Sequence, residues 1–176
     1  EDYSIMRTTS LNGMLTSLAT NYNRRNKNVR LYELGNIYLP KTLPLSELPE
    51  ERMQFTLGMY GEGDFFSMKG VVEEFFDKVG LRGKETYDPN AGKPYLHPGR
   101  QANIIYNGET VGYLGEVHPE VADSYGIGTR AYVAVIDMPY IVKMATFDRK
   151  YAGIARFPAV NRDISMVVPK HILAGQ

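Results

Sequence analysis

The stretch KPYLHPGRQANIIYNGETVGYLGEV, residues 93–117, decides the fold. Two segments in it, QANIIY (101–106) and TVGYLGEV (110–117), are rich in apolar and β-forming residues. They flank Asn107-Gly108, and Asn-Gly between two such runs is the strongest short-range signal for a two-residue β-hairpin. The stretch therefore predicts two neighbouring antiparallel strands.

Helix and strand patterns alternate outward from this hairpin. Apolar residues recur at helical spacing in 11–25 and in 67–79, where Ser67 is the expected N-cap and Gly80 the stop. Short helices are expected at Pro119 and Pro139, because proline suits the first turn of a helix. Strands are expected at 29–39, 52–61 and 130–138, the first apolar on both faces and therefore buried. This order favours an α+β fold with a largely antiparallel sheet flanked by helices.

Composition narrows the classes of function. The 176 residues are 43% hydrophobic and 23% charged with zero formal net charge, which is typical of a globular protein and gives no support to generic phosphate-backbone binding. There is no cysteine, so disulfides and thiolate chemistry are excluded. We expect a cytoplasmic protein without a membrane span or secretory signal. The polar start without methionine and the end after an apolar run suggest a piece of a longer chain.

Few residues are candidates for chemistry. His97 and His118 each precede a proline, and structural roles at turns are favoured over metal binding. Arg100 follows a Pro-Gly turn, where it suits either a carboxylate or phosphate ligand or an ion pair at an interface. Glu33 lies in the strand expected to be buried and needs a cation, which Arg7 or Arg30 can supply; an ion pair is favoured over substrate binding.

Catalytic motifs are not found in the sequence. The glycine-containing stretches match neither a phosphate loop nor a dinucleotide fingerprint, and the serines lack the context of a nucleophile elbow. We therefore predict no catalytic, cofactor-binding or metal-binding residue.

Four longer segments of the sequence, taken together and in this order, are more specific than any single motif. They are MRTTSLNGMLTSLATNYNRRNKNVRLYELGNIYLP, FFSMKGVVEEFFDKVG, YLHPGRQANIIYNGETVGYLGEVHPEV and RFPAVNRDISMVVP. In this combination the chain resembles the C-terminal half of the β subunit of bacterial phenylalanyl-tRNA synthetases. The resemblance implies a domain similar to class II aminoacyl-tRNA synthetase catalytic cores over residues 1–150. It also implies that residues 151–176 are a linker and the first strand, ISMVV, of a truncated ferredoxin-like anticodon-binding domain.

The resemblance further implies a non-catalytic role. The segment YVAVIDMPYIVK (132–143) lacks the glycines and arginine that contact ATP in active class II cores, and YELGNIYLP (32–40) lacks the expected arginine. ATP and Mg²⁺ are expected only in the holoenzyme, with none bound by this part. Expected partners are the α subunit, a second αβ heterodimer and, through the holoenzyme, tRNA(Phe). Interface candidates are 11–25, 29–39 and the proline-rich loop that follows, and the proposed interface or degenerate-site residues are Arg7, Glu33, His97, Gly99, Arg100 and Glu116.

Two other functions stay open. One is a small-molecule-binding module with a class II-like core whose pocket is lined by His97, Arg100, Glu33 and Glu116. The other is direct tRNA contact through a basic cluster, Arg24, Arg25, Lys27 and Arg30.

Overall fold

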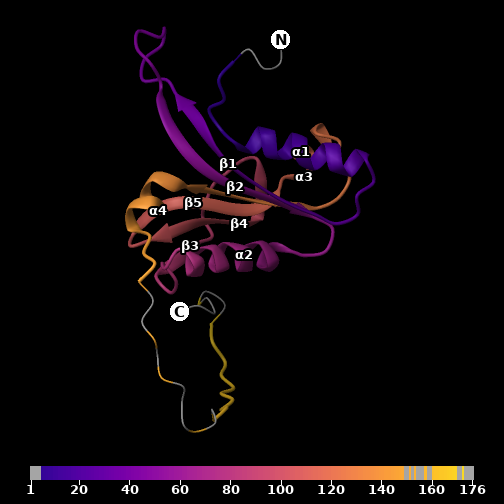
Figure 1. The fold of residues 1–176 in the computed structure, drawn as a ribbon. Coiled ribbons are helices and arrows are strands. Elements are labelled where there is room, and N and C mark those ends of the chain that lie inside the picture. The colour runs from indigo at the N-terminus through magenta and orange to yellow at the C-terminus, as the bar shows by residue number, and fades with distance from the viewer. Residues whose placement is uncertain are drawn as a thin grey trace.

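The computed structural model describes residues 5–148, 151, 153, 157, 160–169 and 172. A six-stranded antiparallel sheet forms its middle layer, and helices lie on both faces (Figure 1). The predicted α+β class, an antiparallel sheet flanked by helices, is confirmed. The elements are α1 (Leu11–Asn23), β1 (Val29–Leu39), β2 (Glu50–Tyr60), α2 (Phe65–Lys78), β3 (Glu85–Asp88), β4 (Leu96–Tyr106), β5 (Glu109–Val117), α3 (Pro119–Ser124), β6 (Ala131–Asp137) and α4 (Met138–Met144).

The strand order is β1-β2-β6-β5-β4-β3. The predicted hairpin joins β4 and β5, and both of its turn residues adopt left-handed backbone, with φ of 50° at Asn107 and 83° at Gly108. Two positive φ angles match the right-handed twist of the strands, which is why Asn-Gly is favoured there. β6 comes from much later in the chain than β2 and fills the centre between β2 and β5. Residues 131–136 of β6 are consequently all buried.

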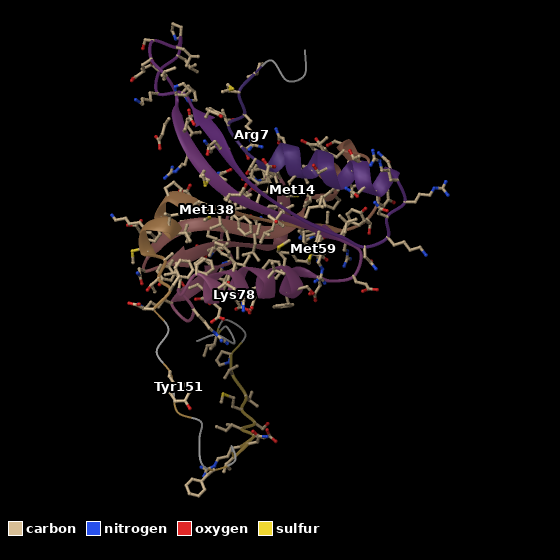
Figure 2. All side chains as sticks on the ribbon, viewed as in Figure 1. Arg7, Met14, Met59, Lys78, Met138 and Tyr151 are labelled. Carbon is tan, nitrogen blue, oxygen red and sulfur yellow. The ribbon has the colours of Figure 1, made fainter. Side chains whose placement is uncertain are left out.

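Each face of the sheet has its own apolar core. On one face, α2 and α4 cover a cluster that includes Val72, Phe76, Ile104, Leu114, Ile136 and Ile141. On the other, α1 and α3 cover a cluster that includes Leu15, Leu18, Tyr60, Val117, Ala122 and Val133. Figure 2 shows Met14 on the α1 side of the sheet and Met59 on the α2 side. We call these two surfaces the α2 face and the α1 face.

The prediction that residues 29–39 form a strand buried on both faces is wrong. β1 is the edge strand, and only its α1 face is well covered, with Val29 and Ile37 buried. On the α2 face, Tyr32 is 76% and Leu34 54% exposed. The reason is that α2 packs mainly over β5 and β6 and meets β2, one strand inside the edge, where the Phe75 and Phe55 ring centres lie 4.9 Å apart. A continuous run of apolar residues occurs both in central strands and in edge strands, so the sequence pattern alone does not distinguish the two positions.

Two local predictions also need correction. The N-cap of α2 is Asp64 instead of Ser67: the Asp64 carboxylate accepts from the Ser67 N–H at 2.8 Å, and the Ser67 hydroxyl accepts from the Asp64 N–H at 3.1 Å. This reciprocal pair is a capping box with Ser67 at its third position. β4 begins at Leu96, so His97 lies in a strand and not at a turn, although the pairing with β5 is irregular between Leu96 and Gln101.

The C-terminal region carries one further prediction. Residues 160–169 include the predicted strand ISMVV (164–168), but they are exposed and contain no strand or helix. The predicted domain boundary at residue 150 lies outside the described residues, so the division into two domains stays a prediction. In the described part of the chain, no helix is long and apolar enough to cross a membrane.

Candidate functional site

A polar hollow of about 250 Å³ opens on the α1 face of the sheet, beyond the end that α1 covers. Strands β2, β4, β5 and β6 supply most of its lining, because residues paired directly across neighbouring strands, such as Gln54 and Asp137, point to the same face. Its polar lining residues are Arg52, Gln54, Lys93, Asn103, Thr110, Tyr113 and Asp137.

An ion pair occupies one side of this hollow. Arg52 Nη2 lies 3.0 Å from Asp137 Oδ2, while Asp137 Oδ1 is buried and accepts no hydrogen bond from the described residues. Burial raises the pKa of Asp137, an effect that Arg52 partly opposes and Glu50 reinforces. Arg52, the only arginine among the described residues that line the hollow, is therefore already engaged by a carboxylate of the same chain.

The other side of the hollow is built around Tyr113. Lys93 Nζ lies 5.2 Å from the centre of its ring, and the Tyr95 ring centre is 5.8 Å away. Burial and the neighbouring Tyr95 raise the pKa of the Tyr113 phenol, so it stays protonated. The hollow has polar groups that can hold a small molecule, but no nucleophile paired with a base. In the residues described, no group of three or more His, Asp or Glu side chains is placed to hold a metal ion.

The predicted site residues form two separate ion pairs. Arg7 Nη1 pairs with Glu33 Oε1, and Arg7 Nε donates to the backbone oxygen of Asn36 at 2.8 Å. Of the two cations predicted for Glu33, Arg7 and Arg30, Arg7 is the one that pairs with it. Glu33 was expected to be buried, but its side chain is about one-third exposed. In the second pair, Arg100 donates from Nε to Glu116 Oε2 at 2.6 Å and from Nη2 to Oε1 at 3.1 Å.

These pairs lie on opposite faces of the sheet. Glu33 shares the α1 face with Val29, and a Cβ added at Gly13 of α1 would lie 3.7 Å from its Oε2 atom. Glu116 pairs in register with Tyr132, a member of the α2-face core. The pocket that was predicted to gather His97, Arg100, Glu33 and Glu116 is therefore not formed, because the sheet separates its members.

The remaining predicted residues have local structural roles. His97 Nδ1 accepts a hydrogen bond from the Gly99 N–H at 3.1 Å. His118 is the N-cap of α3, and its Nδ1 accepts from the Glu120 N–H at 3.3 Å. The favoured structural reading of both histidines agrees with these contacts. The basic cluster of Arg24, Arg25, Lys27 and Arg30 is exposed, and no acidic side chain among the described residues forms an ion pair with it.

An exposed apolar stripe lies on the α2 face of β1 and β2; its β1 part falls within the predicted interface candidate 29–39, although that strand was also expected to be buried. We define the stripe as Tyr32, Leu34 and Met53, and its inner border is Phe55, whose ring centre lies 6.1 Å from that of Tyr32. The loop beyond it adds three exposed leucines, Leu43, Leu45 and Leu48. In Figure 1 the β1–β2 hairpin projects away from the rest of the sheet. The sequence shows that these residues are apolar. It does not show that β1 is the edge strand, which is why Tyr32 and Leu34 are exposed.

The fold can be assigned by comparison with solved structures. Two structures of pyrrolysyl-tRNA synthetase from Desulfitobacterium hafniense superpose with a TM-score of 0.62 at 10% identity, covering 78% of this chain and 49% of theirs. At that identity the likeness concerns the fold alone, which is that of class II aminoacyl-tRNA synthetases. The sequence is more specific: the model of the phenylalanyl tRNA synthetase beta chain CLM domain matches residues 1–138, and the chain belongs to this family.

Curated relatives agree with this membership. The chain is 39% identical over 173 residues to the phenylalanine–tRNA ligase beta subunit of Clostridium tetani and 42% identical over 173 residues to that of Clostridium acetobutylicum. It is 34% identical over 188 residues to that of Halalkalibacterium halodurans. The alignments to both clostridial proteins cover 98% of this chain but only 22% of theirs, so the chain spans about a fifth of the length of these relatives.

Proposed function

We propose that this chain is a non-catalytic assembly module of a phenylalanine–tRNA ligase β subunit. In this proposal the α subunit attaches phenylalanine to tRNA(Phe) with ATP and Mg²⁺, and the chain packs against it in a cytoplasmic αβ heterodimer that pairs into a heterotetramer. Residues 1–150 are the class II-like core, and 151–176 lead into an anticodon-binding domain.

The observation that carries the proposal is the apolar stripe at the edge of the sheet. Exposed apolar side chains on an edge strand favour unwanted association, and proteins usually protect such edges with charges, proline or a covering element. Tyr32 and Leu34 are exposed instead, next to a loop with three more exposed leucines. A contiguous patch of this kind is typical of a surface that a partner covers.

The polar hollow supports the non-catalytic part of the proposal. A site for ATP needs cations that are free to meet phosphate oxygens. In this hollow Arg52 is instead paired with Asp137, which leaves Lys93, over the ring of Tyr113, as the one cation among the described lining residues without an acidic partner.

Sedimentation velocity of the chain mixed with the cognate α subunit tests the proposal. We expect a co-sedimenting complex that Leu34→Lys abolishes, because a charge would then be buried in an apolar contact. Thr86→Lys is the matched control, since Thr86 is an exposed strand residue at the opposite edge of the sheet. Absence of a complex with the unaltered chain, or full binding by the Leu34→Lys variant, would refute the assembly role.

The second candidate function is a small-molecule-binding module. The buried, unpartnered Asp137 Oδ1 atom beside the polar hollow favours it. Titration with ATP and with phenylalanine distinguishes the two, because saturable binding that Arg52→Ala removes would place a ligand in the hollow.

A further inference from the structure

A larger hollow of about 650 Å³ lies on the α2 face, behind the sheet from the polar hollow. It is bordered by the first turns of α2, the end of β3 and the starts of β4 and β6. Its volume is in the range of pockets that enclose small organic ligands. Gly99 and Arg100, two of the predicted interface or degenerate-site residues, line it, but the assembly role proposed above rests on the apolar stripe and does not use this hollow.

Aromatic side chains form much of this hollow. They are Phe65, Phe66, Tyr87 and Tyr132. Phe66 is 73% exposed and meets Phe65 edge to face with ring centres 5.6 Å apart. A large aromatic side chain left so exposed contributes little to the core of α2. It is well suited to stack against a planar ring, since stacking depends on the face of the ring and not on a particular hydrogen-bond pattern.

Two arginines at the rim share one carboxylate. Glu116 has a side chain only 3% exposed and accepts both hydrogen bonds from Arg100. Arg130 shares the same carboxylate, with its Nε atom 3.9 Å from Oε1. Among the described residues, neither guanidinium has another acidic partner. One negative charge therefore serves two positive charges.

Arg130 is the cation that a ligand can reach. Its side chain is 71% exposed, and its ion pair with Glu116 is too long to be a hydrogen bond. Planar guanidinium N–H groups prefer the oxygens of carboxylates and phosphates. Of the other charged groups at the hollow, Lys69 pairs with Glu73 and lies over the Tyr87 ring. Asp64 caps α2 and keeps its negative charge, because hydrogen bonds from Ser67 lower its pKa.

We propose that this hollow binds an aromatic ring that carries an anionic group, of the size of a nucleoside monophosphate. The ring stacks on Phe66, and the anion meets Arg130. A free nucleotide and an unpaired nucleotide of single-stranded RNA both present this chemistry. The inference goes beyond the assembly role and does not rest on it.

Equilibrium dialysis of the purified chain with AMP and with adenosine tests the inference. We expect AMP to bind about tenfold more tightly than adenosine, because a hydrogen bond to a charged group contributes that much. Phe66→Ala should weaken AMP binding about tenfold through lost stacking. Arg130→Ala should weaken it by a similar factor and remove the preference for AMP over adenosine. Arg82→Ala is the control, since Arg82 is exposed, lies outside the hollow and has a single ion pair at 3.6 Å to Asp77.

The source of the ligand follows from a competition experiment. If a single-stranded RNA trinucleotide displaces AMP and binds more tightly, the ligand is RNA. If only AMP binds, the ligand is a free nucleotide. The inference is overturned if neither AMP nor the RNA trinucleotide binds saturably at millimolar concentration. It is also overturned if AMP binding is unchanged in both the Phe66→Ala and Arg130→Ala variants. Both substitutions are at exposed side chains, so the variants are expected to fold.

Discussion

Two phenylalanines on helix α2 allow a matched test of the packing. Phe76 is fully buried in the α2-face core, with its ring stacked on Tyr106 at 5.9 Å and edge-on to Phe75 at 5.8 Å. Phe66 lies on the same helix but is mostly exposed at the rim of the larger hollow. Replacement of either by alanine removes the same atoms, so the difference between the two variants reports the environment alone.

The two variants are expected to lose very different amounts of unfolding free energy. Phe76→Ala loses the transfer free energy of a buried ring and leaves a cavity in a close-packed core, which together lower the free energy of unfolding by about 3–5 kcal/mol. Phe66→Ala loses little burial and should change the free energy of unfolding by less than about 0.5 kcal/mol, as is usual for surface substitutions. Domains of this size are stable by roughly 5–15 kcal/mol, so the first variant loses a large fraction of its stability.

Urea unfolding followed by circular dichroism measures both values. The midpoint should fall sharply for Phe76→Ala and stay unchanged for Phe66→Ala, with equal slopes if the denatured states are alike. Equal losses for the two variants would refute the placement of α2, because Phe66 would then be buried against part of the chain. That result would also remove the basis for a ligand stacking on Phe66.

Three further predictions follow from the packing and the ion pairs. Gly112→Ala should lower the free energy of unfolding by about 2 kcal/mol or more in urea denaturation, since the added Cβ would overlap a backbone oxygen of β6. Burial raises the pKa of Asp137 despite Arg52, so the stability from this group is present below its ordinary value of 3.8 and is lost as pH rises through the raised value. Asp137→Asn should therefore flatten the decline in unfolding free energy that begins as pH rises above 3.8, and an unchanged profile would contradict the assignment. Arg100→Ala should lower both the urea midpoint and assembly with the α subunit, because it removes both hydrogen bonds to the buried Glu116; unchanged assembly and stability would show that Arg100 is not an anchor.

Local sequence signals predicted the elements well. Asn107-Gly108 predicted the β4–β5 hairpin because two consecutive left-handed residues are favourable for few residue pairs. The helical spacing of Leu11, Leu15 and Leu18 predicted α1 and its buried side. These preferences depend on a few neighbouring residues, so they can be recognised in the sequence without knowing how the rest of the chain folds.

The candidate sites were predicted less well. Arg7 was named as a partner for Glu33, and Arg100 was expected to meet a charged group, but nothing in the sequence placed these pairs on opposite faces. Gly99 and Arg100, two of the predicted interface or degenerate-site residues, line the larger hollow, but the hollow itself was not predicted, because it combines residues from α2, β3, β4 and the start of β6. Side chains this far apart in sequence become neighbours only through the order of the strands.

The sequence by itself determined the α+β class, the hairpin, the two long helices and, through the resemblance of its ordered motifs, the family. Tertiary structure alone decided that β6 enters between β2 and β5 and that β1 is left at the edge. The physical reason is that apolar periodicity states which side chains need burial but not which element covers them. Whether Tyr32 and Leu34 are buried or exposed depends on where α2 packs, and that position is fixed by contacts across the whole sheet.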